Sequence, residues 1–301
     1  MAFGSGSSAR IMPIPSKYIL PLFFLALLLG AMILGPLLYF ALAPIWPIPF
    51  HRAVDRALLI SAVGTLFLFR SRIPLGKLWP LNGDAWKQAL LGFVMAFVTA
   101  QALIGFDLAL GGFTSAHLST SQAANRVLLA LVAALVIPPL EETIFRGFMQ
   151  GELSAAFGWR GGWIVTAVIF TLAHFVKAPV ELDHQPVHLW SGASALGAAF
   201  LPLIHGAFLS GKGLNLFLLG LILGGVVLRS GTLWVNAGLH GGLILALLLF
   251  TGFTRPVEIA FLGGDILSSP LTSVVLILLG LWLWLFYRHP SILPETGENA
   301  P

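Results

Sequence analysis

The stretch LVIPPLEETIFRGFMQ (residues 135–150) places charged side chains inside a run of apolar residues. It holds Glu141, Glu142 and Arg146. Glu142 and Arg146 are four residues apart, a helical spacing that supports an ion pair, whereas the side chain of Glu141 points about 100° away. The spacing therefore predicts one neutralised carboxylate, on Glu142, and one that is available as a base, on Glu141. A purely architectural clamp, to which both glutamates contribute, is the alternative.

Two prolines, Pro138 and Pro139, come just before the two glutamates. Because proline cannot donate a backbone hydrogen bond, we expect the helix to kink or restart here. Glu141 and Glu142 would then lie in the first turn after the break, where free backbone N–H groups and the helix dipole favour a carboxylate.

Two later apolar stretches carry histidines. In IFTLAHF, Phe170 and His174 are four residues apart, and in GTLWVNAGLHGGLIL, Asn236 and His240 have the same spacing among glycines that allow close helix approach. Either histidine alone could simply bond to a backbone carbonyl. However, Glu141 and these polar groups lie in three separate apolar stretches. In lipid each needs hydrogen-bond partners, so the lowest free energy is expected when they lie together around water.

A carboxylate, two imidazoles and a carboxamide around water could hydrolyse an amide bond without a covalent enzyme intermediate. Glu141 would take a proton from water, His174 would orient that water, and His240 with an amide donor would hold the oxyanion. No serine, cysteine or pair of aspartates has comparable polar partners in the sequence, which disfavours acyl-enzyme chemistry and an aspartyl dyad.

A metal site could use the same residues. Glu141, His174 and His240 could bind zinc with an open fourth position, although the helical HExxH pattern is absent. The favoured site needs no cofactor, and zinc stays open as the alternative.

The composition indicates where this chemistry would take place. A chain of 301 residues with 57% hydrophobic and 9% charged residues has too little polar surface for a water-soluble globule. We therefore expect an all-α, polytopic transmembrane helical bundle. The absence of cysteine excludes disulfides and a thiol nucleophile. Basic residues lie between apolar runs, which indicates membrane topology rather than nucleic-acid binding.

A helix needs about 20 apolar residues to cross the hydrocarbon core. By this length criterion we expect about eight or nine transmembrane spans. Eight are placed near 18–43, 88–112, 127–150, 161–178, 189–210, 213–229, 231–253 and 268–287. The ninth, 57–69, is short, so it crosses with its flanking arginines snorkelling to the interface or is re-entrant. The first span is expected to be retained, since its uncharged run is too long for a signal-peptide core.

The distribution of basic residues predicts the orientation. The loop at residues 70–87 carries four basic residues and Asp84, which places it in the cytoplasm. Counting spans from there puts Arg160, Lys212 and Arg255 on the same side. The basic residues expected on the opposite side are Arg126, Lys177, Arg229 and Arg288.

The three polar stretches together resemble a known family. EETIFR (residues 141–146), FTLAH (170–174) and GTLWVNAGLH (231–240) are similar to the CPBP family of CaaX-type and bacteriocin-processing intramembrane proteases. That family has the signatures EExxxR, FxxxH and HxxxN. The resemblance covers about residues 125–250. It divides the chain into N-terminal spans (1–124), a CPBP-type catalytic helical core (125–253) and a C-terminal span with a polar tail (254–301).

The resemblance implies a role for each matching residue. Glu141 and His174 would activate water, and His240 would form the oxyanion site. The supporting residues would be Glu142, Arg146, Phe170 and Asn236. It also implies a metal-independent glutamate mechanism.

One position departs from the family pattern. Ile244 stands where HxxxN has asparagine, and isoleucine cannot donate a hydrogen bond. Asn236 lies on about the same helix face as His240, displaced by roughly 6 Å along the axis, and is the candidate to supply the amide. Without such a donor, oxyanion stabilisation would weaken by about 3 kcal/mol.

We therefore expect a multi-pass intramembrane endopeptidase of the bacterial plasma membrane. Its partners would be a peptide or protein substrate and the lipid bilayer, with no nucleic acid. The sequence leaves open which substrate is cleaved and whether it is lipidated. Two alternatives remain: a non-catalytic membrane scaffold for peptide binding or immunity, and a proton-coupled transporter that uses the Glu/His cluster as a relay.

Overall fold

The computed structural model describes residues 15–46, 48–257 and 266–286, and these are almost entirely helical. The predicted all-α membrane bundle is confirmed. The predicted polar tail and Arg288 lie outside the described residues. The helices are α1 (Ser16–Leu42), α2 (Phe50–Leu68), α3 (Leu75–Leu78), α4 (Ala85–Ala109), α5 (Thr120–Glu142), α6 (Gln150–Ala173), α7 (Ser191–Ala199), α8 (Leu201–Ile204), α9 (Gly211–Ser230), α10 (Trp234–Phe253) and α11 (Pro270–Phe286).

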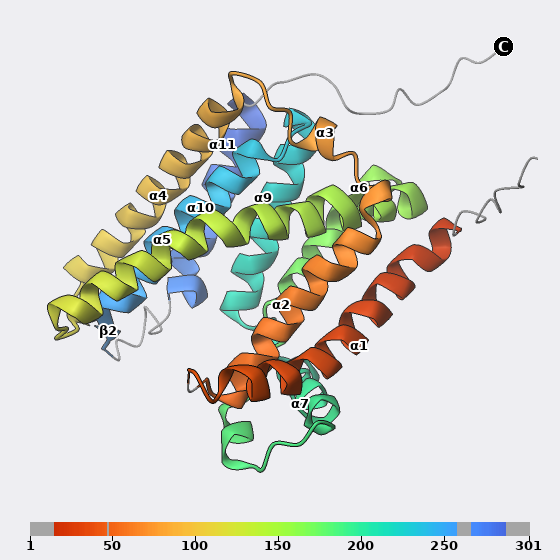
Figure 1. Ribbon diagram of the computed structural model, residues 1–301. Coiled ribbons are helices and arrows are strands. Elements are labelled where there is room, and N and C mark those ends of the chain that lie inside the picture. Colours follow the sequence, from red (N-terminus) through yellow and green to blue (C-terminus); the bar gives the residue numbers. More distant parts are fainter. Residues whose placement is uncertain (1–14, 47, 258–265, 287–301) are drawn as a thin grey trace, which may run out of the picture.

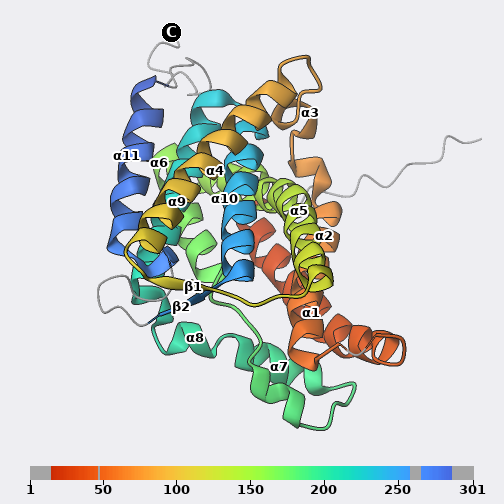
Figure 2. The ribbon, with the colours of Figure 1, turned by 90° about the vertical axis from the view of Figure 1, so that its left-hand side faces the viewer.

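The long helices pack side by side around α10 and α9. Helix α10 lies against α4 and α5, while α9 lies against α6 and α11, and α1 and α2 form a separate antiparallel pair (Figures 1 and 2). Small residues bring α4 and α10 together, because a Cβ added at Gly238 would lie 2.0 Å from the carbonyl oxygen of Ala89. This close approach fixes the helix that carries His240.

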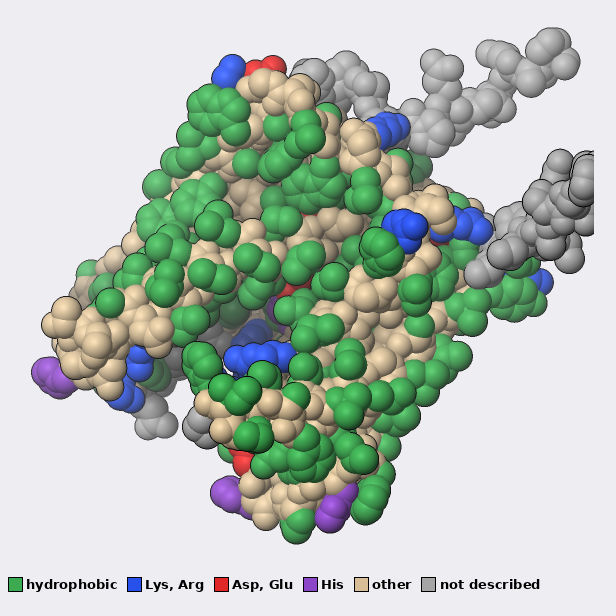
Figure 3. All heavy atoms as spheres, viewed as in Figure 1, with side chains coloured by type: hydrophobic (Ala, Val, Ile, Leu, Met, Phe, Trp, Pro, Cys, Tyr) green, Lys and Arg blue, Asp and Glu red, His purple; other side chains and the backbone are tan. Residues whose placement is uncertain are grey.

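The surface of the bundle suits a lipid environment. Hydrophobic side chains cover most of the face in Figure 3, which is also hollowed near its centre. Within the described residues, 6 helical stretches are long and apolar enough to cross a membrane. They are Lys17–Leu42, Ala85–Ala109, Thr120–Ala173, Ser191–Leu209, Gly211–Ser230 and Trp234–Phe253, with Pro270–Leu285 as a shorter apolar helix.

Helix α2 is longer than the sequence predicted. It begins at Phe50 rather than near residue 57 and has 19 residues. It runs alongside α1, where an added Cβ at Gly30 would lie 2.9 Å from the hydroxyl of Ser61. The prediction cut this helix short because its first turns carry charged side chains.

The helix does not break at Pro138 and Pro139. Helix α5 continues through both prolines to Glu142 and runs directly into a π-helical segment, η2 (Thr143–Met149), and then α6. The two glutamates therefore lie in the last turn of α5 and not in the first turn after a break, so this prediction is wrong.

Contacts with other groups explain why the helix tolerates the prolines. Pro138 has no N–H for the carbonyl of Ala134, and that carbonyl lies against α10, where a Cβ added at Gly241 would be 2.7 Å away. The hydroxyl of Thr143 donates to the carbonyl oxygen of Pro139 at 2.6 Å. The chain bends instead at Gly158, whose φ of 72° suits glycine.

The segment at 189–210 does not form one straight span. It is divided into α7, α8 and a short 3₁₀ helix, η4 (Ala207–Leu209), which lie across one end of the bundle in both ribbon views (Figures 1 and 2). The N–H of Lys177, just after α6, donates to the carbonyl of Ala199 at the end of α7. The helix expected at 189–210 is therefore interrupted in the structure, because apolar composition does not show where a helix is interrupted.

This arrangement corrects the predicted sides of the later basic residues. The turn between α9 and α10 lies beside the loop at 70–87, since the N–H of Leu233 donates to the carbonyl of Leu78 at 2.8 Å. At the other end of α4 and α10, β1 (Phe113–Ser115) pairs antiparallel with β2 (Thr254–Pro256). Arg229 thus lies on the side of the 70–87 loop, and Lys212 and Arg255 lie on the opposite side. The prediction grouped these three residues differently because it counted the segment at 189–210 as one span.

Candidate functional site

A buried ion pair lies at the centre of the site. Nη1 of Arg146 donates to Oε1 of Glu142 at 3.1 Å, and neither side chain is exposed. The predicted Glu142–Arg146 pair is confirmed. The guanidinium also lies 4.3 Å from the centroid of the Phe170 ring, and its Nη2 donates to the carbonyl of Gly220 on α9 at 3.4 Å. The pair therefore ties η2 to α6 and α9.

The carboxylate of Glu142 accepts two further hydrogen bonds, both from α10. Nδ1 of His240 lies 3.0 Å from Oε1, and Nδ2 of Asn236 lies 3.2 Å from Oε2. Hydrogen bonds from an arginine and an amide favour the ionised form of a carboxylate. Glu142 thus acts as a structural anion that joins α5 to α10.

Glu141, the neighbouring glutamate, has a different environment. Its side chain is 22% exposed, and its Oε2 is buried without a hydrogen-bond partner among the described residues. This oxygen lies 3.8 Å from Nε2 of His240, which is too long for a direct hydrogen bond. Two adjacent carboxylates on one helix therefore differ: one is fully bonded, and the other keeps an oxygen for a further partner.

His174 lies at the C-terminal end of α6 and is held by its own helix. Its Nδ1 is 2.8 Å from the carbonyl oxygen of Phe170. A carbonyl only accepts, so Nδ1 carries the proton and Nε2 of the neutral ring is an acceptor. The Phe170 ring lies 4.4 Å from the imidazole of His174 and 6.1 Å from that of His240, measured between centroids. Phe170 thus packs beside both imidazoles.

The bond to Glu142 also sets the protonation of His240. Because the carboxylate accepts from Nδ1, Nε2 of the neutral His240 ring carries a lone pair and cannot donate. Nε2 becomes a donor only in the imidazolium form of the ring.

Asn236 does not offer a donor to an oxyanion in this arrangement. One N–H bond goes to Glu142, and the amide also donates to the carbonyl of Leu223 at 2.7 Å. A carboxamide has two N–H bonds, so both are used. The expectation that Asn236 replaces the amide missing at Ile244 does not fit these contacts, and Asn236 instead positions Glu142.

No sequence pattern predicted the π-helical segment or the contacts that hold it. Nε1 of Trp79 donates to the hydroxyl of Thr143 at 3.1 Å, and Nε2 of Gln150 donates to the carbonyl of Gly224 at 3.2 Å. These bonds connect η2 and its end to the 70–87 loop and to α9. A π-helical turn inside an α-helix is frequent at functional sites, and here it contains Arg146.

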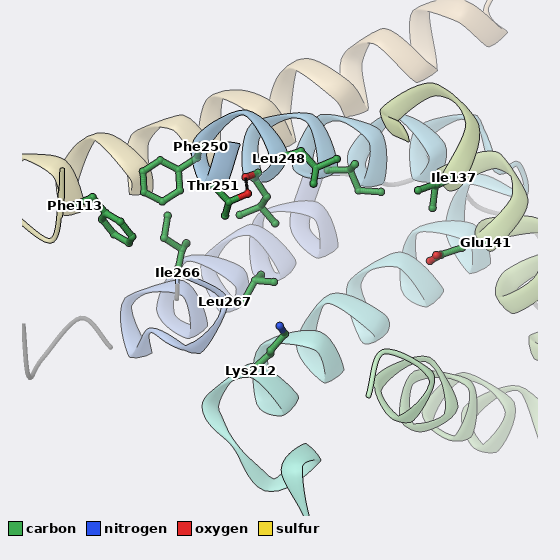
Figure 4. A pocket seen from close by; sticks show the side chains of 11 residues that line it. Phe113, Ile137, Glu141, Lys212, Leu248, Phe250, Thr251, Ile266 and Leu267 are labelled. Atoms are coloured by element: carbon green, nitrogen blue, oxygen red, sulfur yellow. Dashed lines mark hydrogen bonds between the residues drawn. The ribbon is translucent and has the colours of Figure 1, made fainter. Parts of the chain in front are cut away.

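A cavity of about 510 Å³ opens beside Glu141. Figure 4 shows the side chain of Glu141 pointing into it from α5 and the ammonium of Lys212 pointing into it from the first turn of α9. Ile244 also lines it, so the position that carries asparagine in HxxxN borders the same space as Glu141. The remaining lining residues are Phe113, Ile137, Leu247, Leu248, Phe250, Thr251, Ile266 and Leu267.

A metal site would need several ligand side chains close together. In the part of the chain that the structure describes, no three His, Asp or Glu side chains form a group that could hold a metal ion. Glu141, His174 and His240 are not close enough together among the described residues to form such a group.

Comparison with known proteins gives one match. Residues 123–246 match the family model described as Type II CAAX prenyl endopeptidase Rce1-like. The matched region begins in α5 and ends in α10, and it includes Glu141, Glu142, Arg146, Phe170, His174, Asn236, His240 and Ile244. No curated protein and no solved structure matches the chain significantly.

Proposed function

Through residues 123–246 the chain belongs to the CPBP family, and on that premise we propose that it is a CAAX-type intramembrane endopeptidase that activates water with Glu141. Substrates would be peptides or proteins presented from the membrane. The observation that carries the proposal is the contrast between two adjacent glutamates. Glu142 accepts hydrogen bonds from Arg146, His240 and Asn236, while Glu141 keeps a buried oxygen beside His240 and faces the cavity.

The hydrolytic step uses Glu141 and His174. A water molecule between them gives a proton to the Glu141 carboxylate. Nε2 of His174 accepts a hydrogen bond from the other O–H of this water and so orients it. The water oxygen forms a bond to the carbonyl carbon of the substrate. The C–N bond then breaks, and the proton held on Glu141 passes to the leaving nitrogen, which gives a new carboxylic acid and a new amine and restores the Glu141 carboxylate. The acid then loses its proton to water.

The oxyanion of the tetrahedral intermediate would be stabilised by His240. Nε2 donates only when the ring is an imidazolium, and the hydrogen bond from Nδ1 to the Glu142 carboxylate holds the ring in place. This resembles the way in which a buried carboxylate supports histidine in other hydrolases. Glu142, Arg146 and Asn236 are therefore positioning residues that act through His240.

The site needs no metal in this proposal. Water is activated by a carboxylate and an imidazole, and the charge of the oxyanion is balanced by imidazolium. Activity should therefore persist after dialysis against a chelator and should not increase when zinc is added. Loss of activity on chelation that zinc alone restores would replace this mechanism with a zinc mechanism.

A direct test uses purified protein in proteoliposomes with a fluorogenic peptide ending in a CAAX-type sequence, farnesylated or not. Mass spectrometry of the products gives the bond that is cleaved. The wild type should cleave one bond, and Glu141→Ala should not. Equal cleavage by both proteins would overturn the proposal, because a contaminating peptidase or another residue would then be responsible.

A non-catalytic peptide-binding scaffold is the second candidate, and Ile244 is the observation that favours it. The cavity wall beside Glu141 lacks the amide that the family signature provides, and both N–H bonds of Asn236 are used elsewhere. A scaffold would bind the same peptides without cleaving them. Its binding would be unchanged in Glu141→Ala.

A further inference from the structure

We propose that Lys212 determines substrate specificity by binding the carboxylate at the C-terminal end of the substrate, so that the peptide lies in the cavity with its cleaved bond at Glu141. This inference rests on the proposed function and adds a residue that the CPBP signatures do not contain. The feature that points to it is the charge distribution of the cavity. Among the described residues that line it, Glu141 and Lys212 are the charged ones, and the wall is otherwise apolar apart from Thr251.

The position of Lys212 is well defined by its surroundings. It lies in the first turn of α9, after the N-cap Ser210, whose hydroxyl accepts from the N–H of Gly213 at 3.3 Å. Asn215, one turn further, donates to the carbonyl of Leu267 at 2.7 Å and so fixes this end of α9 against another wall of the cavity. A rigid backbone holds the lysine where its ammonium reaches the cavity (Figure 4).

Helix stability does not explain a lysine at this position. A cation in the first turn of a helix is opposed by the helix dipole, which favours anions there. Lys212 is half-buried, in contrast to an exposed lysine such as Lys87. A substrate carboxylate near Lys212 would interact favourably with both the ammonium and the end of the helix.

The separation of the two charged groups suits a short peptide. Lys212 and Gly220 are about two turns apart on α9, or about 12 Å along its axis, and the carbonyl of Gly220 accepts from Arg146 beside Glu142. An extended chain covers about 3.3–3.6 Å per residue. A few residues therefore lie between a carboxylate at Lys212 and a cleaved bond at Glu141, and their side chains would contact Ile244, Leu248 and the rest of the apolar wall.

The test compares pairs of otherwise identical fluorogenic peptides that end in a free carboxylate or in a carboxamide. For the wild type, kcat/KM for the acid should exceed that for the amide by about tenfold or more, the effect of one hydrogen bond between charged groups. In Lys212→Gln this ratio should fall to about one, with the rate on the amide unchanged. Lys212→Arg should keep a preference for the acid.

Arg255→Gln is the matched control, since it removes a positive charge at the same end of the bundle from an exposed residue outside the cavity lining. It should leave the acid-to-amide ratio at the wild-type value. An equal ratio in wild type and Lys212→Gln would overturn the inference, while cleavage of the amide would still support the proposed function. No cleavage of either peptide by the wild type would contradict the proposed function and the inference together.

A phospholipid headgroup is the other source of an anion for Lys212. The assay is therefore repeated in phosphatidylcholine vesicles with and without phosphatidylglycerol. The inference predicts that the acid-to-amide ratio of the wild type is the same in both. An effect of Lys212→Gln that depends on phosphatidylglycerol and not on the peptide terminus would assign Lys212 to lipid binding and overturn the inference.

Discussion

Asn236 donates to Oε2 of Glu142 at 3.2 Å, and this bond changes the role of the asparagine from the one that its position near His240 suggested. Its remaining N–H bond goes to the carbonyl of Leu223. In the proposed mechanism His240 is consequently the donor to the oxyanion, and the apolar side chain of Ile244 borders the cavity one turn away.

Ile244→Asn should raise the rate of cleavage. The new amide would border the same space as Glu141 and could donate to the oxyanion, which in other hydrolases is worth about 10²-fold or more. We expect kcat to increase by at least about tenfold, with KM little changed. Ile244→Leu is the matched control and should behave as the wild type, while an unchanged or lower kcat in Ile244→Asn would show that residue 244 does not face the oxyanion.

Arg146→Met should destabilise the protein strongly. It leaves the buried carboxylate of Glu142 without its cation, at a cost of about 3–5 kcal/mol. The double variant Glu142→Gln with Arg146→Met removes both charges and should recover a large part of the loss. Thermal unfolding in detergent measures both effects, and a double variant that is less stable than Arg146→Met would show that the pair does not act as a unit.

Gly241→Ala should lower thermal stability and activity together. Its Cβ would lie 2.7 Å from the carbonyl oxygen of Ala134, a backbone atom that cannot move without shifting α5. Gly105→Ala on α4 is the matched control, because nothing lies within 4 Å of an added Cβ there. Alanine is the better helix former by about 1 kcal/mol, so the control should be as stable as the wild type or more stable, and equal melting temperatures for the two variants would contradict the close packing of α5 on α10.

The contact between α2 and the loop after α6 should depend on acidity. Burial raises the pKa of Asp183, but hydrogen bonds from the backbone N–H and ring of His51 outweigh burial and hold the pKa below its ordinary value of 3.8. A carboxyl group whose pKa is lower in the folded state than in the unfolded state stabilises the protein at pH values above its unfolded-state pKa. This stabilisation is lost as the pH falls through the folded-state pKa.

The difference in melting temperature between wild type and Asp183→Asn measures this effect. The difference should be constant from about pH 6 to pH 5 and should shrink below about pH 4, as both proteins come to carry a neutral side chain. A difference that stays constant down to the lowest pH would show that the ionised form of Asp183 is not what stabilises the contact.

Local spacing predicted one part of the site correctly. Glu142 and Arg146 are four residues apart on one helical stretch, so their ion pair needs no information about the rest of the fold. The pairing of His240 and Asn236 with Glu142 depends on how α10 is rotated against α5. Close packing at Gly241 sets that rotation, and the sequence alone did not reveal which carboxylate the α10 residues would face.

Tertiary contacts also explain the errors in the predicted fold. Pro138 was expected to break the helix, but α10 packs on the carbonyl that the proline leaves without a partner. The charged residues at the start of α2 shortened the predicted span, although Asp55 accepts a hydrogen bond from the N–H of Ala178 at 3.0 Å. In both places a distant part of the chain satisfies a polar group that the local sequence leaves unsatisfied.

The most direct test of the central claim compares kcat of Glu141→Gln with that of the wild type, on a peptide that the wild type cleaves. Glutamine keeps the size of the side chain but cannot take a proton from water, so kcat should fall by about 10²–10⁴-fold, with the melting temperature unchanged. Glu181→Gln, in the loop after α6, is the matched control and should keep wild-type activity. A Glu141→Gln variant with wild-type kcat would contradict the assignment of Glu141 as the base.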